Sequence, residues 1–319
     1  MNIVVTGSQG TLGKPLVKAL RANGHRVEGI TRAHTDDALV HRADIAEYGQ
    51  MYYLFDKVLE PVDVVYNLAA EFGRHNGERY TEQLWKSNAV GLKNLLKLQV
   101  RYGFKLIHAS SSEVYGNGPM DSPVMDEGMT KRVALEHHND YAMSKWVNEQ
   151  QIVNHMKDNP DCEVIVPRFF NAYGPGEEYH DYRSVVCLFC YRALHNLPIT
   201  VFRDYHRVFM YIDDFIPSLV NLCENKLPRT IGPINIGGRE YRSIEDVVTV
   251  IESFIGPIKH KQFLDQDAHN TVNKFPDITV AEEWLGHNPT IPLEVGIKKT
   301  LEWMIEKYRD TIQRTLPHD

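Results

Sequence analysis

Short apolar runs alternate with longer amphipathic stretches along the first 170 residues of the chain. The apolar runs have the length of buried parallel strands, and the stretches between them repeat apolar residues with the period of a helix. The runs fall at residues 2–6, 26–31, 62–68, 106–107 and 163–167, with helices at 14–23 and 80–102. A repeated order of strand, helix and strand predicts an α/β protein with a doubly wound parallel sheet.

The remainder of the chain lacks this regular order. It contains predicted helices at 185–196 and 293–308 and predicted strands at 199–202, 207–212 and 233–236. The turn Tyr173-Gly174-Pro175-Gly176 marks the point where the chain leaves the sheet. We therefore expect two partly interleaved domains, residues 1–170 and a smaller mixed α/β part at residues 171–319.

Composition and charge exclude several kinds of partner. The 319 residues carry a net charge of −7 without a basic block, so neither nucleic acid nor an anionic membrane is expected. No apolar run approaches the ~20 residues of a membrane span, and the first residues enter a strand directly, which favours a cytoplasmic protein. Cys187 and Cys190 have metal-type spacing but lie in an apolar helix without a second pair, so no metal site is predicted.

The turn after the first strand is rich in glycine and precedes a helix. Its three glycines, at positions 7, 10 and 13, would permit a tight turn, a close approach of a pyrophosphate, and close packing of helix on strand. The N–H groups at the helix start suit the same anion. The turn therefore predicts a Rossmann-like NAD(P)-binding domain over residues 1–170. Its predicted cofactor contacts are Gly7, Gln9, Gly10, Thr11, Leu12 and Gly13.

The end of the second strand bears on the choice of cofactor. The residues Gly29-Ile30-Thr31-Arg32 include no acid to hold a ribose 2′-hydroxyl, and Arg32 can meet a 2′-phosphate, which favours NADP over NAD. Asp44 lies where a loop after a third strand could reach the adenine amine. Further predicted cofactor contacts are Ile45, Leu68, Ala69, Ala70 and Asn88.

Polar side chains follow the apolar run at residues 106–107, where open α/β sheets place their ligands. Ser111, Ser112 and Glu113 are the candidate catalytic residues of this strand end. Tyr141 and Lys145 are four residues apart, which on a helix puts both on one face, so the ammonium can lower the pKa of the phenol toward that of a general base. Tyr53 and Lys57 repeat the spacing without a hydroxyl-rich strand end before them, and we do not expect them to be catalytic.

Six motifs in register resemble the extended short-chain dehydrogenase/reductases, and more narrowly the nucleotide-sugar epimerase/dehydratase family. They are the glycine turn, 67–70, 111–116, Tyr141 with Lys145, 168–175 and 207–214. The resemblance implies that Ser111 bonds the sugar O4, that Tyr141 takes the O4 proton, and that Lys145 holds the nicotinamide ribose. It also implies a nucleoside-diphosphate sugar as substrate, bound by Asn171, Phe202 and Arg207.

The same resemblance leaves several chemistries open. Glu113 would remove the C5 proton once C4 is a ketone, which favours a 4,6-dehydratase of a nucleoside-diphosphate hexose. Decarboxylases of UDP-glucuronate resemble this chain in having a serine, here Ser112, before the glutamate, and a C4 epimerase shares the first step. A dinucleotide-binding sensor without catalysis is the non-enzyme alternative.

The resemblance also implies a homodimer built on two helices. Members of the family commonly pair through the helix that carries the tyrosine and the helix before it. The apolar positions expected at this contact are Val90, Leu95, Leu98, Trp146 and Val147.

Overall fold

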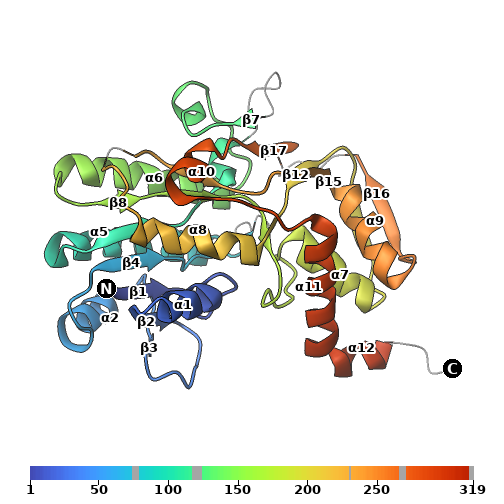
Figure 1. The fold of residues 1–319 in the computed structure, drawn as a ribbon, viewed down its shortest axis with the longest axis horizontal. Coiled ribbons are helices and arrows are strands. Elements are labelled where there is room, and N and C mark those ends of the chain that lie inside the picture. The colour runs from blue at the N-terminus through green and yellow to red at the C-terminus, as the bar shows by residue number, and fades with distance from the viewer. Residues whose placement is uncertain (74–78, 117–123, 230, 266–270, 316–319) are drawn as a thin grey trace.

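A computed structural model of the protein describes residues 1–73, 79–116, 124–229, 231–265 and 271–315 (Figure 1). Its centre is a six-stranded sheet in the order β3-β2-β1-β4-β5-β8, and every neighbouring pair is parallel. This order confirms the doubly wound, Rossmann-like sheet expected from the sequence. The strands are β1 (Asn2–Thr6), β2 (Arg26–Thr31), β3 (Val40–Arg42), β4 (Val64–Asn67), β5 (Lys105–His108) and β8 (Val164–Ile165).

Helices cover both faces of this sheet (Figure 1). In β1, Ile3 and Val5 pack into one core and Val4 packs into another, because successive side chains of a strand point to opposite faces. The first core contains residues of α1 (Gly13–Ala22), α8 (Ile212–Glu224) and α10 (Thr279–Leu285). The second contains residues of α2 (Tyr48–Tyr53), α5 (Gly91–Tyr102) and α6 (Asp140–Asp158).

The helix predicted at residues 80–102 is interrupted around Asn88. It consists of α4 (Thr81–Trp85), the π-helical turn η2 (Lys86–Val90) and α5. Such turns widen a helix locally and often lie near functional sites. A second π-helical turn, η1 (Leu54–Val58), follows α2 at the repeated Tyr53 and Lys57 pair, and Tyr53 is exposed.

A separate three-stranded sheet, in the order β14-β9-β6, includes a strand from the C-terminal part. The short strand β6 (Ser110–Ser111) pairs with β9 (Pro167–Phe169), and β9 pairs with β14 (Ile234–Ile236). Thus β14, α8 and α10 all come from residues after 170 yet complete the first part of the molecule.

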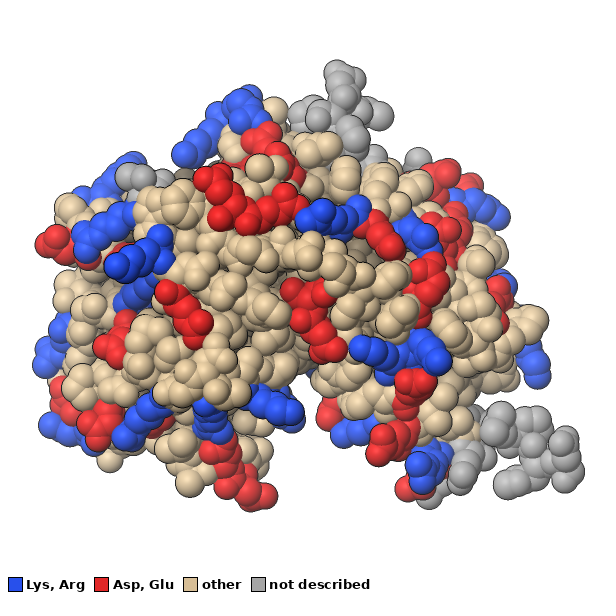
Figure 2. All heavy atoms as spheres, in the orientation of Figure 1, with Lys and Arg blue, Asp and Glu red and all other residues tan. Residues whose placement is uncertain are grey.

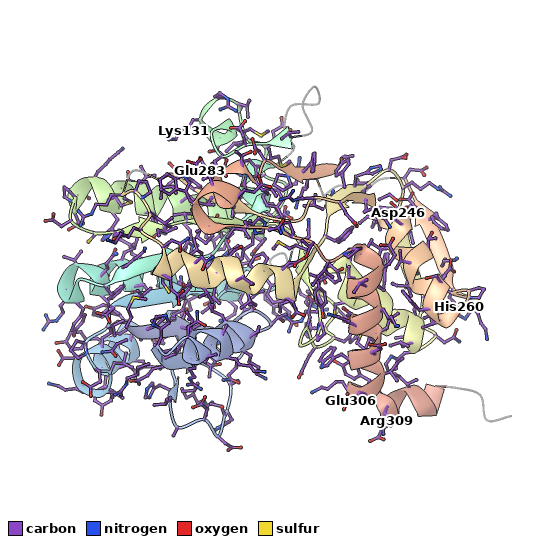
Figure 3. The ribbon with its side chains drawn as sticks, in the orientation of Figure 1. Lys131, Asp246, His260, Glu283, Glu306 and Arg309 are labelled. Carbon is purple, nitrogen blue, oxygen red and sulfur yellow. The ribbon has the colours of Figure 1, made fainter. Side chains whose placement is uncertain are left out.

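The C-terminal part has its own core, formed largely by α7 (Val185–Leu194), α9 (Ile244–Ile255) and α11 (Leu293–Lys307) (Figure 1). Ser243 and Asp246, the latter labelled in Figure 3, form a reciprocal capping box at the start of α9. Cys187 and Cys190 are buried in α7 as expected of a helix face.

The accompanying strands are β7 (Val124–Met125), β10 (Ala172–Tyr173), β11 (Ile199–Phe202), β12 (His206–Val208), β13 (Met210–Tyr211), β15 (Tyr241–Ser243), β16 (Lys261–Leu264) and β17 (Asn273–Pro276). The remaining short helices are η3 (Ser112–Tyr115), η4 (Met129–Lys131) and α12 (Arg309–Thr315).

Two expectations from the sequence are wrong. The strand expected at residues 207–212 is divided into β12 and β13, and Ile212 already begins α8, whose first turn carries Asp213 and Asp214 at the end that favours negative charge. Leu95 and Leu98, expected at a dimer contact, are fully buried in their own core.

Acidic and basic side chains are intermixed over the face in Figure 2, which is hollowed between the two parts of the molecule. No helix within the part of the chain that the structure describes has the length and apolarity needed to cross a bilayer.

A buried ion pair joins α6 to β9 of the three-stranded sheet. Arg168 of β9 donates to both carboxylate oxygens of Glu149, with N–O distances of 2.9 and 2.6 Å, and Ser110 of β6 donates to the same carboxylate at 2.6 Å. Arg168 also donates to the Tyr115 hydroxyl at 2.9 Å. This network fixes the helix that carries Tyr141 against the strand end that carries Ser111.

Replacing Glu149 with glutamine should strongly destabilise the fold, because the Arg168 guanidinium would be left buried without a counter-charge. We expect the free energy of unfolding in urea to fall by about 3–5 kcal/mol. The exposed pair of Arg239 and Glu282 provides a control, and Glu282→Gln should change stability by less than about 1 kcal/mol. Equal effects of the two variants would contradict the assignment.

Candidate active site

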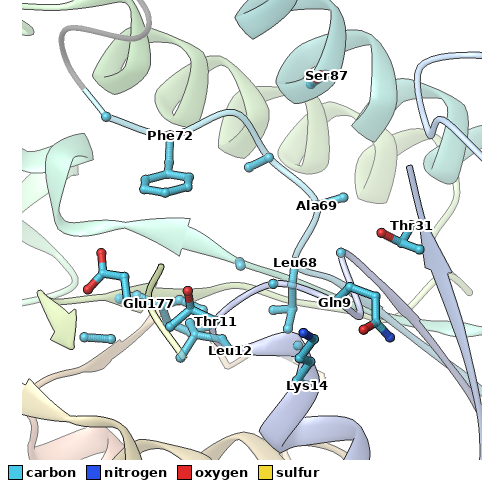
Figure 4. A pocket seen from close by; sticks show the side chains of 18 of the residues that line it. Gln9, Thr11, Leu12, Lys14, Thr31, Leu68, Ala69, Phe72, Ser87 and Glu177 are labelled. Atoms are coloured by element: carbon cyan, nitrogen blue, oxygen red, sulfur yellow. The ribbon is translucent and has the colours of Figure 1, made fainter. Parts of the chain in front are cut away.

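A cavity of about 1020 Å³ lies at the carboxyl ends of the parallel strands. It is lined by residues that follow β1, β2, β4 and β5, which is where open α/β sheets bind ligands. Figure 4 shows the side of the glycine turn with Gln9, Thr11 and Leu12, the segment after β4 with Ala69 and Phe72, and the side chain of Glu177. We call this space the first cavity.

A second cavity of about 290 Å³ adjoins the first and reaches into the C-terminal part. Glu113, Tyr141 and Asn171 line both, so the two spaces meet at these residues. We call it the second cavity.

The glycine turn has the shape that a bound dinucleotide requires. Gly7 has a φ of 68°, and a Cβ added there would lie 2.8 Å from the amide nitrogen of Ala69. A Cβ on Gly13 would lie 2.2 Å from the Gly7 carbonyl oxygen, so side chains at either position would push the turn open. All six predicted contacts in this turn line the first cavity, and α1 begins at Gly13. The residues present therefore fit the pyrophosphate of a dinucleotide.

The segment after β4 forms another wall of the first cavity. Leu68, Ala69 and Ala70 line it, and the Ala69 amide donates to the Thr6 hydroxyl at 3.2 Å. Asn88 lies outside the wall, contrary to the predicted contact with the cofactor. Its side-chain amide instead accepts from the Glu71 amide and donates to the Glu71 carbonyl, both at 2.9 Å, so it holds this segment in place.

The three remaining predicted cofactor contacts, Arg32, Asp44 and Ile45, also line the first cavity. The Asp44 carboxylate accepts from the Ala46 amide at 2.9 Å, which fixes the loop after β3. Arg32 forms an ion pair with Glu71 at 2.5 Å.

Ser111, Tyr141 and Lys145 come together at the first cavity, as the sequence predicts. Ser111 comes from the short strand β6, and the other two residues lie on one face of α6. A hydrogen bond links the Tyr141 phenol to Ser111. The Lys145 ammonium donates to the Ala109 carbonyl at 2.8 Å and lies 5.8 Å from the centre of the Tyr141 ring.

Burial outweighs charge in setting the ionisation of this cluster. Burial raises the pKa of Tyr141 to about 12, the Ser111 hydrogen bond lowers it, and the Glu113 carboxylate raises it. The expected lowering of this pKa by Lys145 is therefore not the net result. Burial also lowers the pKa of Lys145 to about 8, while nearby Glu149 raises it. Both side chains are thus held closer to their neutral forms than in water.

Neighbouring positions after β5 have different surroundings. Ser112 is buried but lines neither cavity, so the structure separates it from the other predicted catalytic residues. Glu113 faces both cavities and forms an ion pair with Lys274 of β17. Lys274 is buried and 161 positions away along the chain, and no local pattern in the sequence indicated this partner.

The predicted substrate residues lie around the second cavity. Phe202, Asn171 and Arg207 all line it. Asn171 donates from its side-chain amide to the Val208 carbonyl at 3.0 Å and has a φ of 36°. Arg207 donates to the carbonyls of His206 and Val272, both at 2.7 Å, and of Thr271, so it also supports the backbone of this wall.

The segment 177–183, which matched no useful sequence pattern, proves to be a wall of both cavities. The Glu177 carboxylate accepts from the Ser184 amide and hydroxyl at 2.9 and 2.6 Å, and burial raises its pKa. The Arg183 guanidinium lies 4.7 Å from the ring centre of Phe72. The available signal was a polar and aromatic stretch directly after a glycine-proline turn, but only tertiary contacts show which cavity it serves.

The parallel sheet and the first cavity together define the class of protein. It is a nicotinamide-dependent short-chain dehydrogenase/reductase. The model of the NAD dependent epimerase/dehydratase family matches residues 3–237. The chain belongs to this family and is an enzyme, so a sensor without catalysis is set aside.

Individual relatives agree with this assignment. The chain is 30% identical over 311 residues to UDP-glucuronic acid decarboxylase 1 of Danio rerio, covering 94% of this chain and 72% of the relative. It is 27% identical to UDP-N-acetyl-alpha-D-glucosaminuronate decarboxylase of Bacillus cytotoxicus, covering 96% and 98%. Among solved structures, UDP-glucuronic acid 4-epimerase from Bacillus cereus in complex with UDP-glucuronic acid and NAD is 26% identical, with a TM-score of 0.83 and coverage of 97% and 100%.

Tyr141→Phe should reduce turnover by at least ~10²-fold, the usual scale for loss of a general acid or base. Cofactor binding and the thermal unfolding temperature should change little, because the ring stays in place and only the hydroxyl is lost. Steady-state kinetics and calorimetry on the same preparation would test both parts. Turnover within a few fold of the wild-type rate would exclude Tyr141 as the proton acceptor.

The pKa of Lys145 predicts a pH-dependent difference in stability between the wild type and Lys145→Met. Below about pH 8 the ammonium is charged in the folded and unfolded chains, so the full cost of its burial is present. Between pH 8 and the ordinary pKa of 10.5 only the folded protein loses the proton, so stability rises with pH. The wild type should gain about 1 kcal/mol over the variant between pH 7 and pH 9 in urea unfolding. A pH-independent difference would contradict the lowered pKa.

Proposed function

We propose that the enzyme converts a UDP-uronic acid to a UDP-pentose by transient oxidation at C4 and loss of the C6 carboxylate as carbon dioxide. The supporting observation is that the Ser111, Tyr141 and Lys145 cluster opens onto a second cavity. Three cationic side chains, Arg183, Arg207 and Lys274, line it against two acidic ones, Glu113 and Asp181. Such a lining, in a chain with a net charge of −7, suits a substrate that carries a diphosphate and a carboxylate.

This proposal replaces the 4,6-dehydratase expected first from the sequence with the expected alternative. Both named relatives are decarboxylases of UDP-linked uronic acids, and one solved structure with the same overall fold is a 4-epimerase of UDP-glucuronic acid. The Glu113 argument for dehydration required only that C5 be acidic beside a ketone, which holds equally for a 4-keto uronic acid.

The cofactor in this proposal is NAD, which is bound in the Bacillus cereus epimerase structure. When bound, it accepts a hydride from C4 of the sugar and later returns it. Gly7 to Gly13 would hold its pyrophosphate, and Lys145 would hold the nicotinamide ribose beside Tyr141.

The residues of the chain supply the proton transfers. Tyr141, hydrogen-bonded to Ser111, takes the proton from the sugar O4 as C4 becomes a ketone. The product is a β-keto acid, in which the bond from C5 to C6 breaks, carbon dioxide leaves, and the electron pair remains on C5 in conjugation with the ketone. One proton must then be added to C5. Glu113 and Lys274, which line the second cavity as an ion pair, are the proposed positioning groups for that proton. Tyr141 returns its proton to O4 as C4 is reduced.

A C4 epimerase of a UDP-uronic acid is the second candidate, because its first step is identical and the Bacillus cereus enzyme shares 26% of its residues with this chain. In that reaction the 4-keto sugar rotates within the site, so that the hydride returns to the opposite face of C4. The carboxylate is retained.

We also retain two further proposals. The first is a homodimer through η2, α5 and α6, where exposed apolar side chains remain on the surface. These are Val90, Val100, Met143 and Val153, in place of the buried leucines. The second is a cytoplasmic location, which rests on the sequence alone.

Incubation with UDP-glucuronate and NAD in deuterium oxide should give a UDP-pentose with one deuterium at C5, read by mass spectrometry. The deuterium is expected because the proton added to C5 comes from solvent-exchangeable groups. UDP-glucose, dTDP-glucose and GDP-mannose serve as controls and should not lose mass. Unchanged mass with inverted C4 would establish the epimerase, and loss of water would restore the dehydratase.

A further inference from the structure

The strand β2 ends without the acidic residue that holds the adenosine ribose in many NAD-binding proteins. It ends at Thr31 and is followed by Arg32, which by itself would suit the 2′-phosphate of NADP. The structure brings a carboxylate to this position from the segment that follows β4. Glu71, four positions after the last residue of β4, lies against Arg32 with a distance of 2.5 Å between guanidinium and carboxylate.

The Arg32 and Glu71 pair sits at the edge of the first cavity. Arg32 lines the cavity, as do Ala70 and Phe72 on either side of Glu71. The pair therefore connects the wall after β2 with the wall after β4, beside the part of the cavity where the Rossmann arrangement places the adenosine ribose.

Glu71 is the more firmly held partner of the two. Its backbone amide and carbonyl are both bonded to the Asn88 side chain at 2.9 Å, and Asn88 also donates to the Ser144 hydroxyl at 3.0 Å. Its side chain is 20% exposed, against 53% for Arg32. The Glu71 backbone is thus held in place by Asn88, and its side chain is the less exposed of the pair.

NAD and NADP differ only in the phosphate on this ribose. A 2′-phosphate at Arg32 would have to displace or lie beside the Glu71 carboxylate, and like charges in contact are unfavourable. A neutral 2′-hydroxyl meets no such repulsion and can donate to a carboxylate. We propose that Glu71 selects NAD against NADP, and that it does so by neutralising Arg32 at the edge of the first cavity. This inference requires a bound dinucleotide but no particular sugar chemistry, so it stands or fails independently of the proposed decarboxylation.

The test is a binding competition that needs no catalytic turnover. Purified protein is equilibrated with equal concentrations of NAD and NADP, separated rapidly from free cofactor, and the bound cofactors are measured by mass spectrometry. The wild type should retain mainly NAD. Glu71→Gln should shift the ratio at least about tenfold toward NADP, equivalent to ~1.4 kcal/mol, because Arg32 keeps its charge while the carboxylate is lost.

Three further variants separate this role from a general structural effect. Arg32→Ala and the double variant Glu71→Gln with Arg32→Ala should both lack the gain for NADP, because the gain needs the guanidinium. Glu282→Gln removes the same charge from an exposed arginine pair on α10 and should leave the ratio unchanged. The backbone bonds of Glu71 to Asn88 do not involve its side chain, so Glu71→Gln should unfold at the wild-type temperature.

A wild type that retains mainly NADP would overturn the proposal, because Arg32 would then leave Glu71 for the phosphate. A Glu71→Gln ratio within twofold of the wild-type ratio would also overturn it. A gain for NADP that persists in the double variant would show that Glu71 acts without Arg32, which contradicts the mechanism proposed.

Discussion

The active-site cluster depends on one face of α6 lying in a fixed register against the end of β5 and β6. Three side chains at four-residue spacing make this contact: Tyr141 bonds to Ser111, Lys145 donates to the Ala109 carbonyl, and Glu149 accepts from Ser110. The last of these three side chains, Glu149, forms an ion pair with Arg168, whose side chain is only 1% exposed. Because an ion pair in this position is tolerated only with its hydrogen bonds complete, a shifted helix would be disfavoured. The register of the reactive phenol is thus set two helical turns away from it.

The two parts of the chain share a strand pair, a core and an ion pair. Residues after 170 supply β14 beside β9 and α8 against the core of β1, and Lys274 of β17 reaches the Glu113 carboxylate. The wall of the second cavity therefore cannot form without the strand end that carries Ser111. The proposed reaction oxidises C4 of a sugar and changes C5 or C6. This arrangement holds the cluster of Ser111, Tyr141 and Lys145 at a fixed distance from the residues of the second cavity.

Local patterns in the sequence were sufficient for the sheet, the glycine turn and the spacing of Tyr141 and Lys145, because each depends on residues close together in the chain. They failed where a side chain's surroundings come from elsewhere. Ser112 differs from Ser111 by one position, but Ser111 ends the strand β6 whereas Ser112 begins the helical turn η3, so the two side chains have different surroundings. Leu95 and Leu98 were predicted at a dimer contact because the spacing of apolar residues on a helix does not reveal how wide its buried face is. Glu71, Lys274 and Glu149 acquire their roles from residues 39, 161 and 19 positions away, and no spacing rule covers such distances.

The Glu113 position shows why the family's chemistries are hard to separate from a motif. Every reaction that begins with a ketone at C4 makes C5 acidic, so a carboxylate near C5 is compatible with loss of water, loss of carbon dioxide or retention of both. What differs is the leaving group on C6 and the charge that surrounds it. In this chain Glu113 is already paired with a buried ammonium, and two guanidinium groups and the Asp181 carboxylate line the same cavity. A neutral C6 hydroxyl gives those cations nothing to neutralise beyond the diphosphate, whereas a carboxylate on C6 adds a second anion. The charge on C6, more than the motif, therefore distinguishes the proposed uronic acid from a neutral hexose.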